Sequence, residues 1–416
     1  MLDNYIKYYF TFAWRNIWRN KKRSILATSS IFFAVFLALA MRSLQFGQYE
    51  YMVNFTVSLY TGYLQLQAKG FWDNRSFDES FEFNDTLYNK LKNYPGISNI
   101  NPRIETAALI SHVTETRISP VIGIDPDLED KMTGLKKRLF KGEYLNEDSK
   151  GILIAEGLAD RLNVDVGDSI VVFGQGFQGV IAAQVFHVQG IIKFPIPKMN
   201  NAFVFMTIKN AQELFNLSNR ITSIPIMINN PSKLYEFKKE LSARIDSNLV
   251  VMTWEEMSPE IVQAIEVDNA SGFIMLLILY VVIGFGVFGT IVMMTLERTR
   301  EFGLLISLGM ERDKIYLVTT IESILISFFG ALLGVIVAFP VLLYFYFNPI
   351  PVSGEIADIY LSYGMEPIIP FSIDSNIFIS QMLIVFLISL LTSLYPISFI
   401  RKIRPVSALQ GRGGMK

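Results

Sequence analysis

Charged residues gather in one short stretch of the chain, between two long apolar segments. Glu297, Arg298, Arg300 and Glu301 follow an uncharged run from Gly272 to Leu296. Carboxylate and guanidinium groups three or four positions apart on a helix form ion pairs, and they keep their side of the helix in water. The apolar run is long enough to cross a bilayer at about 1.5 Å per residue. We therefore predict that a membrane helix ends here at the water interface.

The residues that follow are predicted to form a short turn along the membrane surface. An apolar stretch from Phe302 ends at Gly309, a residue type that commonly ends helices in the left-handed conformation. Charged residues return at Glu311, and the chain is apolar again from Ile315. Such a turn would expose a small apolar face to a partner protein. The alternative is an ordinary charged loop between two membrane helices.

Glu322 is an ionisable residue about two turns into the next apolar segment. A charged side chain inside a membrane is costly, so it is a functional candidate by default. A structural alternative is that it lies at the cytoplasmic headgroup level and pairs with Arg298 or Arg312. The sequence leaves both hypotheses open.

A glycine pattern in the first apolar run formally matches the dinucleotide-binding fingerprint. Gly284, Gly286 and Gly289 have the GxGxxG spacing. The pattern follows no strand and lies within a membrane span, so nucleotide binding is not expected. Small residues instead let helices approach closely, and we predict a helix-packing contact here, either with a second copy of the chain or with a paralogue.

Several chemistries are not expected from the composition. The chain has no cysteine, and its two histidines, His112 and His187, stand apart in strand-like surroundings, so no metal site is predicted. No Gly-Lys-Ser or Gly-Lys-Thr occurs, so a P-loop ATPase is excluded and energy from ATP would have to come from a partner. Neither a catalytic set for a membrane-anchored enzyme nor a basic aromatic patch for nucleic acid stands out.

Hydropathy and charge divide the chain into membrane and extramembrane parts. With 51% hydrophobic residues among 416, the chain is too apolar for a soluble domain. We predict a membrane α-helical fold with four transmembrane helices and a large α+β extracytoplasmic domain inserted between helices 1 and 2. Lysine and arginine are absent from residues 347–373 but frequent near both termini. The positive-inside rule then places both termini in the cytoplasm. A cleaved secretory signal ending near Ala38-Leu39-Ala40 is the alternative for the first span.

Four stretches of the sequence resemble one family. Residues 297–309 fit the pattern ER-x-x-E-[IF]-G-x-L-x-x-x-G, and residues 13–24 fit A-W-R-N-[LI]-x-R-[NS]-[KR]-x-R-[ST]. Residues 158–168 fit LA-x-x-L-x-[VL]-x-x-GD, and residues 403–409 fit [LI]-x-P-[VI]-x-A-L. These patterns are similar to those of ABC transporter permeases of the MacB and FtsX type, which include the Lol-type lipoprotein-releasing permeases.

The resemblance implies roles for individual residues. In this family the segment after the second membrane helix is the coupling element that a cytoplasmic ABC ATPase dimer contacts, and that partner binds ATP and Mg²⁺. The residues expected to carry this role are Glu297, Arg298, Arg300, Glu301, Gly303, Leu308 and Gly309. The family also has a glutamate at the position of Glu322, followed by small residues that match Gly330 and Gly334, which we expect to pack membrane helices.

The predicted segments follow from these patterns. They are a cytoplasmic amphipathic helix (1–22), transmembrane helix 1 (23–42), a periplasmic α+β domain (43–269), transmembrane helix 2 (270–296), a cytoplasmic coupling segment (297–314), transmembrane helix 3 (315–346), a periplasmic loop (347–373), transmembrane helix 4 (374–397) and a cytoplasmic tail (398–416).

The stretch from Tyr60 to Trp72 looks more like the Lol-type branch than the MacB branch. This implies a permease subunit that uses mechanotransmission to extract lipoproteins from the outer leaflet of the inner membrane. Its partners would be a second permease copy or paralogue, membrane lipids, the lipoprotein and a periplasmic carrier. Alternatives are a MacB-like efflux permease working with a periplasmic adaptor and an FtsX-like signalling permease that controls a cell-wall hydrolase.

Lol-type permeases recruit their carrier through a hairpin called the hook. The matching connection in this chain is shorter and contains Gly174, Gln175, Gly176 and Phe177. It is either a partner-binding turn or a plain β-turn.

Overall fold

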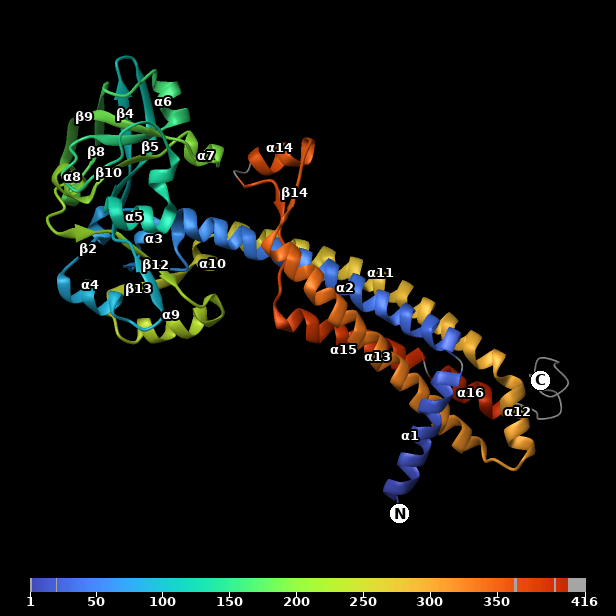
Figure 1. The fold of residues 1–416 in the computed structure, drawn as a ribbon. Helices are drawn as coiled ribbons and strands as arrows, with labels where there is room; N and C mark the ends of the chain where they lie inside the picture. Colours follow the sequence, from blue (N-terminus) through green and yellow to red (C-terminus); the bar gives the residue numbers. More distant parts are fainter. Residues whose placement is uncertain (1, 20, 363–364, 393, 403–416) are drawn as a thin grey trace. The chain divides into compact units, whose positions relative to one another are not determined.

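Two compact units make up the structure, a computed structural model that describes residues 2–19, 21–362, 365–392 and 394–402 (Figure 1). We call them the membrane unit, which contains the described residues up to Glu50, Ile265–Ile350 and those from Ile369 onward, and the α+β unit, which contains Tyr51–Ala264 and Pro351–Ile368. The motif predicted at 403–409 lies outside the described residues.

Four helices in the described part of the chain are long and apolar enough to cross a membrane, as predicted. Figure 1 shows α2, α11, α13 and α15 side by side, and buried residues from all four form one apolar core. The helices of this part are α1 (Leu2–Arg19), α2 (Lys21–Thr56), α11 (Pro259–Glu297), α12 (Thr299–Ser307), α13 (Arg312–Phe347), α15 (Ser375–Thr392) and α16 (Tyr395–Lys402).

Two glycines of α13 bring this helix close to α2. A Cβ atom added at Gly330 would lie 2.8 Å from the Cβ of Ile31, and one added at Gly334 would lie 2.8 Å from the Cβ of Val35. Carbon atoms cannot approach so closely, so only glycine fits at these two positions without a shift of one helix. The two helices are therefore packed backbone against backbone, as small residues allow in membrane proteins.

This packing gives a testable expectation for Gly334. Changing Gly334→Ala should lower the free energy of unfolding by about 1–3 kcal/mol, because the added methyl group forces α2 and α13 apart. The control is Ser271→Ala on α11, an exposed position outside the predicted packing glycines, where alanine is the better helix former. Thermal unfolding of the purified variants, followed by tryptophan fluorescence, measures the difference. Equal stability of the two variants would contradict the close packing at Gly334.

The α+β unit is built on one eleven-stranded sheet with the order β13-β1-β12-β4-β5-β10-β7-β9-β6, in which β3 also pairs with β12 and β8 joins β4 to β9. The strands of this sheet are β1 (Leu64–Ala68), β3 (Ile97–Ile100), β4 (Arg103–His112), β5 (Glu115–Ile124), β6 (Leu139–Gly142), β7 (Ile152–Ala155), β8 (Ser169–Gln175), β9 (Ile181–Ile192), β10 (Val204–Thr207), β12 (Ser223–Ile228) and β13 (Leu249–Thr253). Shorter ladders are β2 (Phe81–Glu82) with β11 (Arg220–Ile221), and β14 (Ile350–Pro351) with β15 (Ile368–Ile369).

The strand β4 is the longest-paired element of the sheet. It pairs antiparallel with β5 over its whole length, from Arg103↔Ile124 to His112↔Glu115.

Helices connect and cover the strands, and all are short. They are α3 (Phe71–Asn74), α4 (Asp85–Lys92), α5 (Pro126–Thr133), α6 (Glu156–Leu162), α7 (Pro197–Asn200), α8 (Ile208–Phe215), α9 (Leu234–Ser242), α10 (Trp254–Met257) and α14 (Glu355–Ser362).

The helix boundaries differ from the predicted segments at both ends of the α+β domain. The first membrane helix does not end near residue 42 but continues as α2 to Thr56. The second predicted membrane segment, 270–296, lies within α11, which already begins at Pro259 and is separated from α10 by Ser258 in a non-helical conformation. Hydropathy marks the apolar part of a helix and not its whole length, which explains the first difference. Pro259 explains the break at Ser258, because proline disfavours a helical residue before it.

Candidate functional site

The coupling segment is a short helix with a well-defined start and end. The helix α11 ends at Glu297, Arg298 leaves the helical conformation, and α12 then runs to Ser307. Gly309 has φ +91°, which confirms the predicted left-handed cap. The Gly309 N–H donates to the carbonyl of Ile306, and the Met310 N–H donates to that of Leu305, both at 3.0 Å. This is a Schellman motif, and it satisfies carbonyl groups that a helix end otherwise leaves without partners.

The helix α12 has one buried side and one exposed apolar side. Phe302 and Gly303 are buried, and Phe302 packs with Ile315 of α13 and with α16. On the other side Leu304 is 51% exposed and Leu308 is 76% exposed. Glu297 and Arg300 also lie on exposed surface. The segment thus presents two neighbouring leucines with charged residues beside them, which is the pattern expected of a protein contact.

A buried ion pair fixes the start of α12. The Arg298 guanidinium donates to Oε2 of Glu322 at 2.6 Å, and the two side chains are only 8% and 3% exposed. The Asn16 amide of α1 donates to the same oxygen at 3.0 Å. Arg298 is therefore the observed partner of Glu322, and the pair links the α11–α12 junction, α13 and α1.

The same contacts extend to a second carboxylate. Oε2 of Glu301 lies 3.4 Å from Nε of Arg298 and 3.1 Å from a guanidinium nitrogen of Arg19. Charges of alternating sign thus run from Arg19 through Glu301 and Arg298 to Glu322. Glu322 also accepts from Asn16, which lies on α1 like Arg19. We call these five residues the junction network. Because its members come from three helices, a displacement of α12 acts on α1 and α13 as well.

A further polar cluster joins α2 and α11 towards their other ends. The Tyr49 hydroxyl donates to Asp268 at 2.6 Å, and the Gln45 amide donates to the Tyr49 oxygen at 2.7 Å. Arg42 donates both to Gln45 at 2.6 Å and to Asn269 at 3.2 Å. Two polar clusters therefore hold the described membrane helices together, one near each end of α11.

The other predicted site residues lie apart from the junction network. An added Cβ at Gly284 would touch only Ile388, at 3.6 Å, and Gly286 and Gly289 face open space in the described chain. Their contact with a second chain remains a prediction. In the α+β unit, Gln175 ends β8 and the connection to β9 is tight.

The Gly174–Gly179 connection is packed against its own domain. An added Cβ at Gly176 would lie 2.6 Å from the carbonyl oxygen of Phe215, and the Arg220 guanidinium lies 5.0 Å from the centre of the Phe177 ring. The Gly176 N–H also donates to the carbonyl of Val180 at 2.7 Å. The connection is thus a compact turn and not a long projecting hairpin.

Two family models match the chain. Residues 24–244 match the MacB-like periplasmic core domain, and residues 273–405 match the FtsX-like permease C-terminal model. The first match alone covers more than half of the 416 residues. The chain belongs to the MacB/FtsX family of ABC transporter permeases. A MacB/FtsX permease is a transporter subunit, and it implies a separate partner ATPase.

Individual relatives of this MacB/FtsX permease are distant. It is 24% identical to the lipoprotein-releasing system transmembrane protein LolC of Neisseria meningitidis serogroup B, over 59% of this chain and 61% of that protein. It is 22% identical to an ABC transporter permease of Methanocaldococcus jannaschii, over 78% of this chain and 81% of that protein. The periplasmic region of MacB from Actinobacillus actinomycetemcomitans is 18% identical, over 50% of this chain and 94% of that chain, with a TM-score of 0.35. The chain spans about three fifths of the length of the curated LolC relatives it matches.

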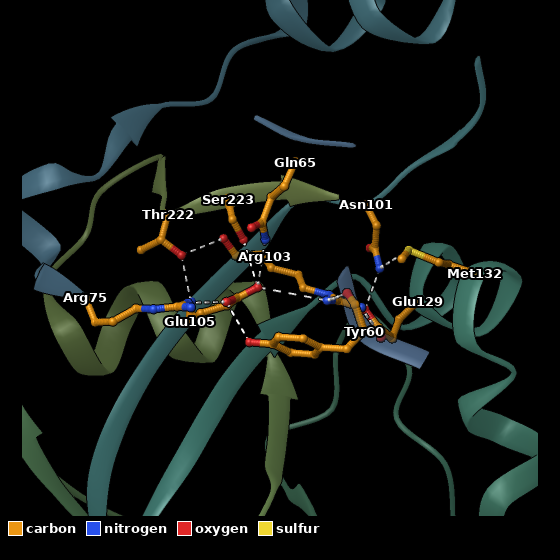
Figure 2. A network of polar contacts seen from close by, with 10 residues as sticks. All are labelled: Tyr60, Gln65, Arg75, Asn101, Arg103, Glu105, Glu129, Met132, Thr222 and Ser223. Atoms are coloured by element: carbon orange, nitrogen blue, oxygen red, sulfur yellow. Dashed lines mark hydrogen bonds and ion pairs between the residues drawn. The ribbon is translucent and has the colours of Figure 1, made fainter. Parts of the chain in front are cut away.

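Sequence reasoning missed two members of the junction network and a second buried network. Asn16 and Arg19 lie within the pattern at residues 13–24, but nothing in their spacing indicates contact with residues about three hundred positions away. In the MacB-like core domain, Figure 2 shows Arg103 bound to Glu129 and close to Glu105, deep in the domain. Burial alone would lower the pKa of Arg103, but the carboxylates of Glu129 and Glu105 raise this pKa above its ordinary value. The guanidinium therefore stays charged in the core.

Proposed function

We propose that this MacB/FtsX permease works by mechanotransmission and extracts lipoproteins from the outer leaflet of the bacterial inner membrane. The observation that carries the proposal is the segment around α12, a capped helix with exposed Leu304 and Leu308 that one buried ion pair, Arg298–Glu322, attaches to the membrane helix α13. A cytoplasmic ABC ATPase dimer would bind this segment, and ATP and Mg²⁺ would be bound by that partner and not by this chain.

The helices supply a route for the motion. α11 is continuous from Pro259 to Glu297 and α2 from Lys21 to Thr56, so each carries a displacement along its length without a loop. In the α+β unit, β1 follows α2 along the chain and β13 precedes α10 and α11. The two strands pair with each other, and the Trp254 N–H donates to the carbonyl of Tyr63 at 3.0 Å. The ends of the two helices are thereby joined in one hydrogen-bonded element.

The proposed substrate rests on two observations. The LolC relatives are named as parts of a lipoprotein-releasing system. The membrane helices carry few polar side chains, and those that are buried, such as Glu322 and Gln381, bond to other residues of the chain. The described membrane helices thus offer few polar groups to line a hydrophilic pore, which favours work on a lipid-anchored substrate at the outer surface. We propose membrane lipids, a lipoprotein, a periplasmic carrier and a second permease copy or paralogue as partners.

The proposed orientation places both termini in the cytoplasm. Residues 347–373 contain Glu355, Asp358 and Glu366 but no lysine or arginine. Basic residues lie instead at the start of α2, at Lys21 and Lys22, and in the coupling segment, where they alternate with acidic ones. By the positive-inside rule the coupling segment then faces the cytoplasmic ATPase, and the MacB-like domain faces the periplasm.

ATP hydrolysis in nanodiscs tests the substrate. The chain is reconstituted with its ATPase, and hydrolysis is measured with and without a triacylated lipoprotein and a soluble carrier. We expect stimulation by the lipoprotein and its transfer to the carrier. Assembly with the ATPase without stimulation or transfer would contradict lipoprotein extraction and leave the permease assignment intact.

A MacB-like efflux permease with a periplasmic adaptor is the second candidate. It is favoured by the compact Gly174–Gly179 turn, which offers a carrier no projecting hairpin. Stimulation of ATP hydrolysis by an adaptor protein, without any effect of lipoprotein, would support this candidate. An FtsX-like role in control of a cell-wall hydrolase would instead require hydrolase activation on ATP binding.

A further inference from the structure

The first membrane helix enters the α+β unit through an unusual turn. After Thr56 the helix widens into a π-helical turn, Val57–Thr61, which ends at Gly62 with φ +68°. A Cβ atom on Gly62 would lie 2.9 Å from the backbone nitrogen of Ile226, so the chain passes very close to β12 before β1 begins. Single π-helical turns are rare and often occur at functional positions.

The strand β4 holds this turn from the side. Arg103 donates to the main-chain oxygen of Tyr60 at 2.6 Å, and the Tyr60 hydroxyl donates to Glu105 at 2.7 Å (Figure 2). The guanidinium of Arg103 also lies 5.2 Å from the centre of the Tyr60 ring. Both the backbone and the side chain of one residue in the turn are thus fixed by neighbours on the strand that is paired over its whole length.

The holding residues are themselves fixed by other elements. Glu129 of α5 binds Arg103 through both oxygens, at 2.9 and 2.7 Å. Glu105 accepts from Arg75 at 3.1 Å and from Ser223 of β12 at 2.9 Å. The two arginines and two glutamates balance in charge. The turn is therefore connected to α5, β4 and β12 by directional bonds.

Stability alone does not account for these buried charges. Well-packed hydrophobic side chains of similar volume would often give equal or greater stability than a buried ion pair. What the charges add is direction, because bidentate and charge-assisted hydrogen bonds fix orientation as well as distance.

We propose that Arg103, Glu105 and Glu129 are positioning residues that lock the end of α2 onto the MacB-like domain, so that a displacement of this helix moves the domain as one body. This role rests on the proposed mechanotransmission. The three residues form a joint, and they do not contact substrate.

Distances between two spin labels test the joint without any partner or substrate. The chain has no cysteine, so Val53→Cys on α2 and Lys209→Cys on α8 can be labelled alone in the full-length protein in nanodiscs. The test variant is Arg103→Met with Glu129→Leu, which removes one buried charge of each sign and leaves Glu105 paired with Arg75, so the variant should fold. We expect the distance distribution to broaden by about a factor of two, because the turn loses its directional bonds and keeps its covalent link. A distribution as narrow as that of the parent would overturn the proposal.

Two further variants show whether the broadening comes from loss of the joint or from a general disturbance of the fold. Tyr60→Phe removes only the hydroxyl bond to Glu105 and should broaden the distribution less, whereas an unchanged width in both variants would count against the joint. The control Lys141→Ala removes an exposed ion pair with Asp165 and should leave the width unchanged. In the assembled transporter, the double variant should hydrolyse ATP at the parental rate with loss of periplasmic output. If lipoprotein release is not the function, only this last measurement is affected, and the spin-label result still decides the joint.

Discussion

Changing Leu304→Asp and Leu308→Asp together is expected to weaken binding of the partner ATPase by about 100-fold or more. Full burial of one leucine contributes about 1.5–3 kcal/mol, and each 1.4 kcal/mol is a factor of ten in affinity. Both side chains are largely exposed on α12, so their replacement should not unfold the chain. Binding of the purified ATPase to the chain in nanodiscs, measured by biolayer interferometry, gives the affinity directly.

The matched control is Ile118→Asp in the α+β unit. Ile118 is also exposed and apolar, and the change in chemistry is the same, but it lies outside the coupling segment. Parental affinity is expected for this control. If the double leucine variant also bound the ATPase with parental affinity, the exposed face of α12 would not be the contact surface.

The sequence predicted the end of the short helix at Gly309 correctly because the signal for it is local. A left-handed glycine after an apolar stretch fixes the end of a helix whatever surrounds it, and Gly309 has that conformation. The predicted α+β class of the domain inserted between the first two membrane helices is also confirmed. The pairing of strands such as β12 and β13 with β1 could not be predicted, because it is decided by distant partners rather than by the pattern of each strand.

The polar networks could not be predicted because they join residues far apart in the chain. Glu322 could be named as a candidate from its place in an apolar segment, and Arg298 as one of two partners. The contribution of Asn16 depends on how α1 packs against α13, which no spacing within α1 specifies. Likewise Arg103 and Glu129 meet only because α5 packs next to the start of β4.

Changing Glu322→Leu is expected to lower the free energy of unfolding by about 3–5 kcal/mol, because it leaves the charge of Arg298 buried with one weaker partner. That partner is Glu301, at 3.4 Å from Nε. The comparison is Glu311→Ala, which removes the exposed ion pair with Lys314 in the same segment and should cost no more than about 1 kcal/mol. Chemical unfolding of both variants in detergent micelles measures the difference. Equal losses for the two variants would mean that the Arg298–Glu322 pair is not buried as described.

The double variant Arg298→Met with Glu322→Leu separates stability from coupling. Removing both charges leaves no buried charge without a partner, and only the Asn16 amide loses its bond to Glu322, so we expect stability to recover to within about 1–2 kcal/mol of the parent. Output driven by ATP should not recover, because the start of α12 then lacks the directional bonds to α13 and α1 that pass on its displacement. ATP hydrolysis and transport are measured together in nanodiscs, and their ratio reports the coupling. Recovery of the parental ratio would show that the pair serves stability alone, whereas a stable variant that hydrolyses ATP without transport assigns the junction network to the transmission of force.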